Sequence, residues 1–194
     1  MKAVLASKNP YKLAEIQAIL SGLGVEVVME SKLGLDIDVD ETGTTFEENS
    51  RLKAEAVMRA ANMPAIADDS GLMVDALGGE PGVYSARYAG VHGDDAANNA
   101  RLMEKMAGVT ERGAQFVSAI ALARPGVPLV VAEGVCRGTI TDAPRGENGF
   151  GYDPYFVPEG MTRTFAELPA EVKNGISHRA RALDALKKLL TEEK

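Results

Sequence analysis

The sequence lacks tryptophan, has a single cysteine, and contains only 5% aromatic residues. One cysteine, Cys136, cannot form an intrachain disulfide, so nothing points to an oxidising compartment, and we interpret it as a small buried apolar residue. No apolar run is long enough to span a membrane, and the run at residues 3–6 is too short for a signal-peptide core. These absences predict a cytoplasmic protein with no membrane partner.

Clustered positive charge is also missing. Lysine and arginine number 21 against 28 acidic residues, which gives a net charge of −7. A nucleic-acid binder or a membrane-surface binder needs a concentrated positive field, so the sequence argues against both classes of partner. A polyanionic small molecule would instead need a few cations placed locally.

The remaining composition is that of a globular protein, with 45% hydrophobic and 25% charged residues in a chain of 194. This length allows one domain, or two lobes that share one core. The sequence shows no repeat, linker or low-complexity segment. We therefore expect residues 1–194 to act as a single domain.

One stretch combines burial with acidic chemistry. The apolar residues 65–67 predict a buried strand, and Asp68, Asp69, Ser70 and Gly71 follow directly. Neighbouring side chains of a strand point to opposite faces, so both carboxylates could reach one ligand only if the chain turned there, as Gly71 would permit. One interpretation is an Asx-type turn joining two strands. The other is a carboxylate pair that holds a hard divalent cation and activates water.

The N-terminal segment predicts a strand at residues 2–6 that leads into a helix. Asn9 is a suitable N-cap and Pro10 a suitable first helical residue. A helix N-terminus attracts anions, and Lys8 and Lys12 add positive charge to this one. The spacing alone is also that of an ordinary capped turn.

A second helix is predicted at about residues 45–62, after the acidic segment 36–41, which reads as a solvated loop. Lys53 falls in the middle of the apolar face of this helix, and Asn49 lies at its edge. An unpaired ammonium is too costly to bury, so we expect Lys53 to meet a buried anion. The helix should then face the Asp68–Asp69 pair.

The second half of the chain predicts further regular elements. The pattern indicates a helix at residues 94–106 and a central strand, buried on both faces, at residues 116–123. Strands at 129–132 and 135–141 should continue the sheet. These elements extend the α/β pattern of the first half.

Two late stretches carry polar chemistry again. In residues 147–154, Phe150 lies between two glycines and Tyr152 follows the second, which suits either a flat ligand or a hairpin bracketed by glycines. Near the end, Ser177 is a candidate N-cap, with His178 and Arg179 in the first turn of the last helix. Positive charge opposes the helix dipole there, so an anionic or carbonyl-bearing ligand is the better explanation.

Six motifs, taken together and in order, resemble the inosine triphosphate pyrophosphatase family. They are Ser7-x-Asn9-x-x-Lys12, Phe46-x-x-Asn49 with Lys53, Ala67-Asp68-Asp69-Ser70-Gly71, and the stretches 81–88, 149–154 and 176–179. The resemblance runs from Ala3 to about Leu190. Lys8 departs from it, because bacterial relatives commonly carry glycine there.

The resemblance implies an α/β fold with a mixed, elongated central sheet flanked by helices, and two lobes with an active-site cleft between them. It further implies a homodimer that uses Mg²⁺ to hydrolyse the triphosphates of inosine and xanthosine (ITP and XTP) and their deoxy forms to the monophosphate and pyrophosphate. This reaction cleanses the nucleotide pool.

The resemblance also assigns roles to residues. Asp69 would be the metal-linked base, with Asp68 and Lys53 beside it, and Asp40 or Glu41 would complete the magnesium site. The residues expected to bind the triphosphate or line its site are Ser7, Lys8, Asn9, Lys12, Asn49, Ser70 and Lys173. Those expected to cradle the base and sugar are Phe150, Gly151, Tyr152 and Asp153. His178 and Arg179 would read the 6-oxo edge of the base.

Two other classes stay open from the sequence. A related pyrophosphatase for modified pyrimidine triphosphates would share the carboxylates and the magnesium but differ in the base pocket. A nucleotide sensor would bind without turnover. The Asp68–Asp69 pair argues against a sensor, because binding a polyanion gains nothing from two nearby carboxylates.

Overall fold

The computed structural model describes residues 2–21 and 24–192. Its six-stranded sheet has the order β2-β1-β3-β4-β5-β6, and β1 pairs in parallel with both β2 and β3. The strands are β1 (Lys2–Leu5), β2 (Glu26–Met29), β3 (Ala65–Val74), β4 (Gly113–Arg124), β5 (Val127–Ile140) and β6 (Phe156–Pro158). The helices are α1 (Pro10–Leu20), α2 (Phe46–Ala61), α3 (Asp95–Lys105), α4 (Ala170–Ile176) and α5 (His178–Glu192). This composition of elements agrees with the expected mixed α/β class.

The chain divides into two compact units. The first comprises the described parts of residues 1–69, 118–134 and 178–194, and the second comprises residues 70–117 and 135–177. Two units are consistent with the expectation of two lobes. The single domain and the cleft stay predictions.

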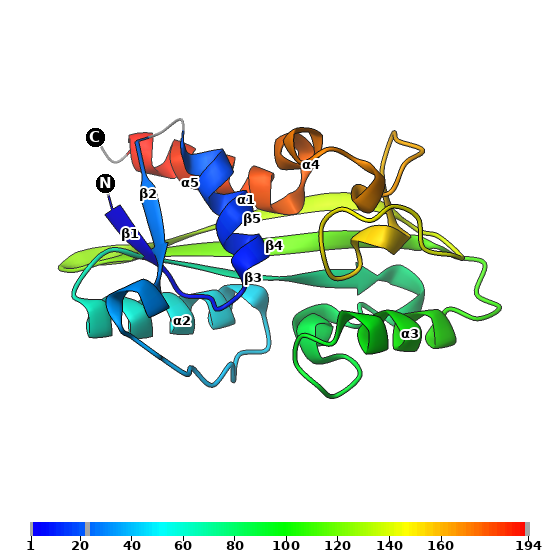
Figure 1. The fold of residues 1–194 in the computed structure, drawn as a ribbon, viewed down its shortest axis with the longest axis horizontal. Helices are drawn as coiled ribbons and strands as arrows, with labels where there is room; N and C mark the ends of the chain where they lie inside the picture. Colours follow the sequence, from blue (N-terminus) through cyan, green and yellow to red (C-terminus); the bar gives the residue numbers. More distant parts are fainter. Residues whose placement is uncertain (1, 22–23, 193–194) are drawn as a thin grey trace. The chain divides into compact units, whose positions relative to one another are not determined.

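The first unit has two hydrophobic layers on opposite faces of its part of the sheet. Helices α1 and α5 lie on one face and α2 on the other (Figure 1). Ile66 and Ile120 pack with α1 and α5, whereas their neighbours Ala65 and Ala121 pack with α2. This alternation follows from the period of two in a strand, and it decides where each polar residue farther along β3 and β4 can point.

The second unit has its own apolar core. Leu72, Phe116 and Phe156 are buried there with Leu102 of α3. The rings of Phe116 and Phe156 meet edge to face, with their centroids 4.7 Å apart. Buried Cys136 belongs to this core, which confirms its predicted packing role.

Local sequence signals explain where the first helices begin. Asn9 caps α1 by accepting hydrogen bonds from the backbone amides of Tyr11 and Lys12. Thr45 caps α2 in a reciprocal arrangement with Glu48, and Asn62 ends the helix in the left-handed conformation. The predicted starting points of both helices are confirmed.

Two predicted strand interruptions are wrong. Gly71 does not turn the chain, because β3 continues through it from Ala65 to Val74. Likewise β5 runs unbroken through Gly134, where a side chain would collide with the backbone of His178 at 2.2 Å. At both places glycine stays in a strand, and at Gly134 it lets α5 approach closely.

Within the described ranges, no helix combines the length and the apolar character needed to cross a bilayer.

Candidate active site

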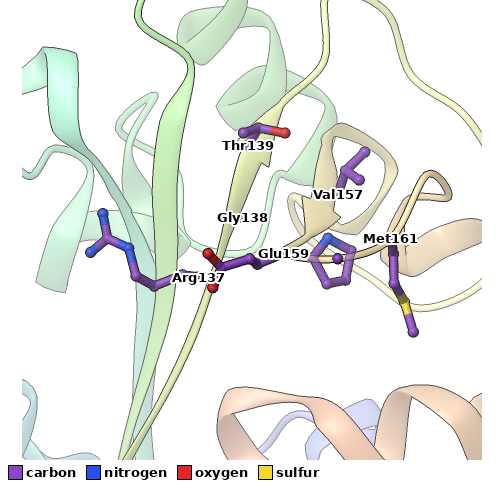
Figure 2. A pocket seen from close by; sticks show the side chains of 8 residues that line it. Arg137, Gly138, Thr139, Val157, Glu159 and Met161 are labelled. Atoms are coloured by element: carbon purple, nitrogen blue, oxygen red, sulfur yellow. The ribbon is translucent and has the colours of Figure 1, made fainter.

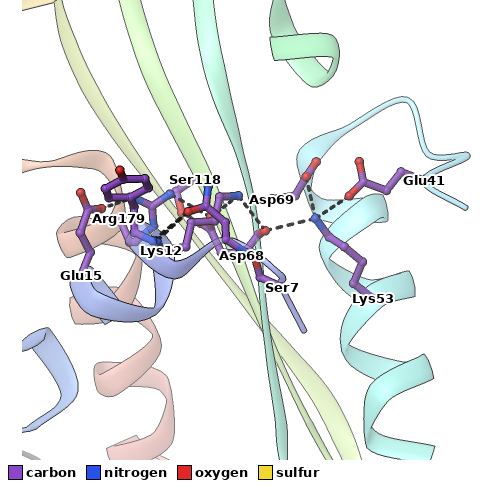
Figure 3. A network of polar contacts seen from close by, with 11 residues as sticks. Ser7, Lys12, Glu15, Glu41, Lys53, Asp68, Asp69, Ser118 and Arg179 are labelled. Carbon is purple, nitrogen blue, oxygen red and sulfur yellow. Dashed lines mark hydrogen bonds and ion pairs between the residues drawn. The ribbon is translucent and has the colours of Figure 1, made fainter. Parts of the chain in front are cut away.

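The carboxylates of Asp68 and Asp69 lie on opposite faces of β3. Asp68 follows Ile66 in the strand alternation and points toward α1 and α5, whereas Asp69 follows Ala67 and points toward α2 (Figure 3). The possible turn at this point is absent, and without it the two carboxylates face different groups, as the alternation of a strand requires. An unbroken strand instead gives each carboxylate its own set of cations.

Asp68 is fully buried and accepts three charged or polar contacts. Arg179 of α5 donates to it at 2.9 Å, Lys12 of α1 lies 2.8 Å away, and the Ser118 hydroxyl of β4 donates at 2.5 Å. Burial alone would raise the pKa of Asp68, but Arg179 and Lys12 hold that pKa well below its usual range. Asp68 is thus a permanent anion that fixes two cations.

Arg179 is itself buried, with a second carboxylate on its other side. Its guanidinium also pairs with Glu15 of α1. Burial disfavours the charge, yet Asp68 and Glu15 together raise the pKa of Arg179. The argument that positive charge at this helix start lacks a structural explanation was therefore wrong. Reading of the base by Arg179 and by the buried His178 stays a prediction.

Asp69 faces Lys53 of α2 on the other side of the sheet. The Lys53 ammonium donates to Asp69 Oδ1 at 2.8 Å and lies 2.8 Å from Glu41 (Figure 3). The expectation that Lys53 meets a buried anion is confirmed. The second oxygen of Asp69, Oδ2, is buried and has no hydrogen-bond partner among the described residues.

The pKa of Asp69 moves in the opposite direction to that of Asp68. Burial raises the pKa of Asp69, and the nearby Lys53 and Lys12 cations offset only part of that shift. A carboxylate with a raised pKa is a better proton acceptor than an ordinary aspartate. The strand therefore presents one inert anion and one basic carboxylate at consecutive positions.

The carbonyl oxygen of Asp68 brings two cations together. It accepts from Lys53 at 3.1 Å and from Lys12 at 3.3 Å. The two ammonium groups, from α2 and α1, therefore converge on one backbone atom of β3. An anion-binding role for these two cations stays a prediction.

The loop at residues 34–45 carries Glu41 to this position. The Gly43 amide donates to Asn49 Oδ1 at 2.8 Å, and a side chain at Gly43 would lie only 2.6 Å from that oxygen. Asn49 is fully buried, and its Nδ2 has no partner among the described residues. Asp40, in contrast, is exposed. The loop thus brings Glu41 to Lys53 and Asp69.

The β1–α1 connection has the geometry of a capped turn. Ser7 accepts from the Asn9 amide at 3.1 Å, and Asn9 caps the helix as described above. Lys8 lies 2.6 Å from Asp36 in an exposed ion pair. An anion-binding role for this turn stays a prediction.

The late aromatic stretch lies in the second unit and forms a turn followed by a short 3₁₀ helix. The Phe150 amide and the Lys173 ammonium both donate to Asp153 Oδ2, at 3.0 and 2.5 Å. Asp153 and Lys173 are both buried, and the Tyr152 hydroxyl donates to the Ser85 carbonyl at 2.7 Å. Ser70 is partly exposed on β3. The triphosphate-binding role assigned to Lys173 stays a prediction.

Sequence reasoning missed two members of the site, Glu15 and Ser118. Glu15 lies three residues after Lys12 on α1, a spacing that puts both on one helix face. Ser118 is the one hydroxyl in the apolar run 116–123. Both signals are legible in the sequence, but only the tertiary fold joins them to Asp68.

Two further observations concern metal ligands and cavities. Among the described residues, no group of three or more histidine, cysteine or acidic side chains is arranged to hold a metal ion. A hollow of about 270 Å³ in the second unit contains none of the predicted site residues (Figure 2). Its lining includes Arg137, Val157 and Met161.

Comparisons with known proteins show what the whole chain is similar to. The model of the Ham1 family matches residues 3–189. The dITP/XTP pyrophosphatase of Streptomyces avermitilis is 49% identical, with 98% of each chain covered, and that of Bacillus subtilis is 48% identical, with 97% of this chain and 96% of the relative covered.

Two solved structures agree over nearly their whole length. The Ham1 protein of Staphylococcus aureus is 46% identical, with a TM-score of 0.88 and full coverage of both chains. A HAM1 protein from Coxiella burnetii is 42% identical, with a TM-score of 0.87 and 99% coverage of both chains. These matches confirm the predicted fold class.

Proposed function

Because the chain belongs to the Ham1 family, we propose that it is a nucleoside triphosphate pyrophosphatase that cleanses the nucleotide pool. Its substrates are ITP, XTP and their deoxy forms, and its products are the monophosphate and pyrophosphate. Support comes from the relatives named dITP/XTP pyrophosphatases at 48% and 49% identity. The family predicted from the six motifs is confirmed.

The observation that carries the proposed chemistry is the environment of Asp69. Its Oδ2 is buried without a protein partner among the described residues, while Oδ1 is held by Lys53 at 2.8 Å. A fixed carboxylate with a free oxygen and a raised pKa can orient a water molecule and accept its proton. We assign Asp69 as the base for water attack on the α-phosphorus.

Mg²⁺ fits the pair of carboxylates formed by Asp69 and Glu41. Asp69 and Glu41 both lie 2.8 Å from the Lys53 ammonium, which marks a place where positive charge is stabilised between hard oxygen donors. Mg²⁺ usually binds through one or two protein carboxylates together with substrate phosphates, so a group of three protein ligands is not required. Bound there, it would offset the charge that develops on the departing pyrophosphate. Glu41 is the better candidate than exposed Asp40.

The cations have a complementary role. Lys12 and Lys53 converge on the Asp68 carbonyl, and Asp68 and Arg179 hold this arrangement from the side of α1 and α5. Fixed positive groups stabilise the phosphate oxygens during in-line displacement without needing to reorganise. Asp68 therefore acts as a positioning anion, and Asp69 accepts the proton of the attacking water.

The chain is further proposed to act as a homodimer in the cytoplasm. Tyr84 and Val91 are large apolar side chains that are 60% and 65% exposed, which suits a partner surface. Light scattering coupled to size exclusion measures the mass, and a monomeric mass at micromolar concentration contradicts the dimer.

A panel of nucleoside triphosphates with Mg²⁺, with every product identified, tests the function. We expect ITP, XTP and their deoxy forms to give monophosphate and pyrophosphate faster than ATP, GTP or pyrimidine triphosphates. Preference for a modified pyrimidine triphosphate would point to the related pyrophosphatase. Binding of nucleotide without any product would point to a sensor.

A further inference from the structure

Two adjacent asparagines of α3 hold two different segments of the second unit. Asn98 accepts from the Ala89 amide at 2.8 Å and donates to the Ala86 carbonyl at 3.1 Å. Asn99 instead donates to the Gly151 carbonyl at 2.9 Å. The two side chains share a residue type and a helix, but each ties down a different piece of backbone.

Gly151 is held at both of its backbone polar groups. Asp95, one helical turn before Asn99, accepts from the Gly151 amide at 2.7 Å. Residues four apart in a helix lie on the same face, so Asp95 and Asn99 form one two-point clasp. Hydrogen bonds to both the N–H and the C=O of one residue fix its position and its orientation together.

The clasped residue lies at the centre of the late aromatic turn. Gly151 has φ +62, a left-handed conformation that favours glycine, between Phe150 and Tyr152. On the other side of the turn, Asp153 binds the Phe150 amide and the Lys173 ammonium, and Lys173 lies 5.1 Å from the centroid of the Phe150 ring. The turn is therefore held from α3 and from α4 at once.

We propose that Asp95 and Asn99 are positioning residues that set the place of the Phe150–Asp153 turn and thereby the affinity for the purine base. This inference rests on the proposed function, together with the base-binding role that the family resemblance implies for residues 150–153. Neither side chain touches the base in this account. They act through Gly151, so their loss moves the Phe150 ring.

Binding of inosine monophosphate, measured calorimetrically without metal, tests the clasp independently of turnover. Asp95→Ala and Asn99→Ala should each raise the dissociation constant about fivefold to tenfold, the scale of one lost hydrogen bond. Asp95→Asn keeps an acceptor oxygen for the Gly151 amide and should restore near wild-type affinity. Pyrophosphate, which has no base, serves as the second probe, and its affinity should stay unchanged in all variants.

Asn98→Ala is the matched control. It removes the same side chain from the same helix, so it should lower the thermal midpoint at least as much as Asn99→Ala while leaving the affinity for inosine monophosphate unchanged. In turnover, Asn99→Ala should raise KM for ITP and leave kcat within about twofold, because positioning of the base contributes to binding.

Equal weakening by Asn98→Ala and Asn99→Ala would overturn the proposal, since stability alone would then explain the loss. Wild-type affinity in both Asp95→Ala and Asn99→Ala would also overturn it, as would failure of the wild-type protein to bind inosine monophosphate. Failure of the proposed function is a separate result, in which wild-type protein binds the monophosphate but releases no pyrophosphate from ITP.

Discussion

Asp68 and Asp69 are consecutive residues of β3, and their carboxylates pair with cations on opposite faces of the sheet. Asp68 pairs with Lys12 and Arg179, and its pKa is lowered, whereas Asp69 pairs with Lys53, and its pKa is raised. Extended backbone thus gives two identical side chains different environments.

Asp69→Asn should abolish turnover and leave the thermal midpoint equal or higher. The amide cannot accept the proton from water, which removes the base. Stability is retained because the substitution removes a buried charge and its repulsion with Glu41, while Lys53 keeps Glu41 and the Asp68 carbonyl as partners. Thermal unfolding and turnover of ITP measure the two effects. Near-normal activity would show that Asp69 is not the base and has a structural role only.

Lys53→Met should lower both stability and turnover. The Lys53 ammonium neutralises Asp69 and Glu41, so its loss leaves two carboxylates close together and destabilises the fold by about 1–3 kcal/mol. Turnover should fall about 100-fold or more, the scale of losing one preorganised donor. In an Asp69→Asn background the loss of stability should shrink, because one carboxylate is gone. An equal loss in both backgrounds would rule out the pairing.

Glu41→Gln and Asp40→Asn form a matched pair that tests the magnesium site. Glu41 lies beside Lys53 and Asp69, whereas Asp40 is exposed, so only Glu41→Gln should raise the magnesium concentration at half-maximal rate, by about tenfold or more. Chelation of metal should stop turnover in the wild type, and added Mg²⁺ should restore it. Equal effects of the two variants would show that Glu41 does not bind the ion.

Arg179→Met should destabilise the protein strongly, by about 3–5 kcal/mol, because it leaves the carboxylates of Asp68 and Glu15 without their shared cation. Neutralising the partner with Asp68→Asn should recover part of that loss. Denaturant unfolding of the single and double variants measures both. A mild effect, below about 1 kcal/mol, would contradict the buried ion pair.

Base reading by Arg179 needs its own comparison. Arginine is an obligate donor, so it suits the 6-oxo group of inosine and opposes the amino group of adenine. We expect the loss of kcat/KM in Arg179→Met to be larger for ITP than for ATP, with discrimination against GTP unchanged, since guanine shares the 6-oxo group. Equal fractional losses on all three would assign Arg179 to the ion pairs alone.

Local patterns in the sequence predicted the helix starts well, because capping depends on neighbours in the chain. Asn9 and Pro10 marked the start of α1 directly, and the predicted start of α2 near residue 45 agrees with the Thr45–Glu48 cap that the structure shows. The position of Lys53 on an apolar helix face also predicted correctly that its ammonium meets a buried anion, which is Asp69. In each case the physical cost is local, either an unsatisfied backbone amide or a desolvated ammonium.

The site itself depends on contacts that local patterns cannot reveal. Arg179 and Asp68 are 111 residues apart, and Glu15 and Arg179 are 164 apart. Gly71 was misread as a turn because glycine and serine mark turns in general, yet here the neighbouring strand partners keep β3 extended. Long-range pairing overrode the local signal.

Hydrolysis of ITP in ¹⁸O-labelled water tests the central claim most directly, with mass spectrometry of both products. Attack by water at the α-phosphorus places the label in inosine monophosphate and leaves pyrophosphate unlabelled. Label in pyrophosphate would place the attack at the β-phosphorus, and release of labelled orthophosphate with inosine diphosphate would place it at the γ-phosphorus. Either result would contradict the assignment of Asp69 as the base for attack on the α-phosphorus.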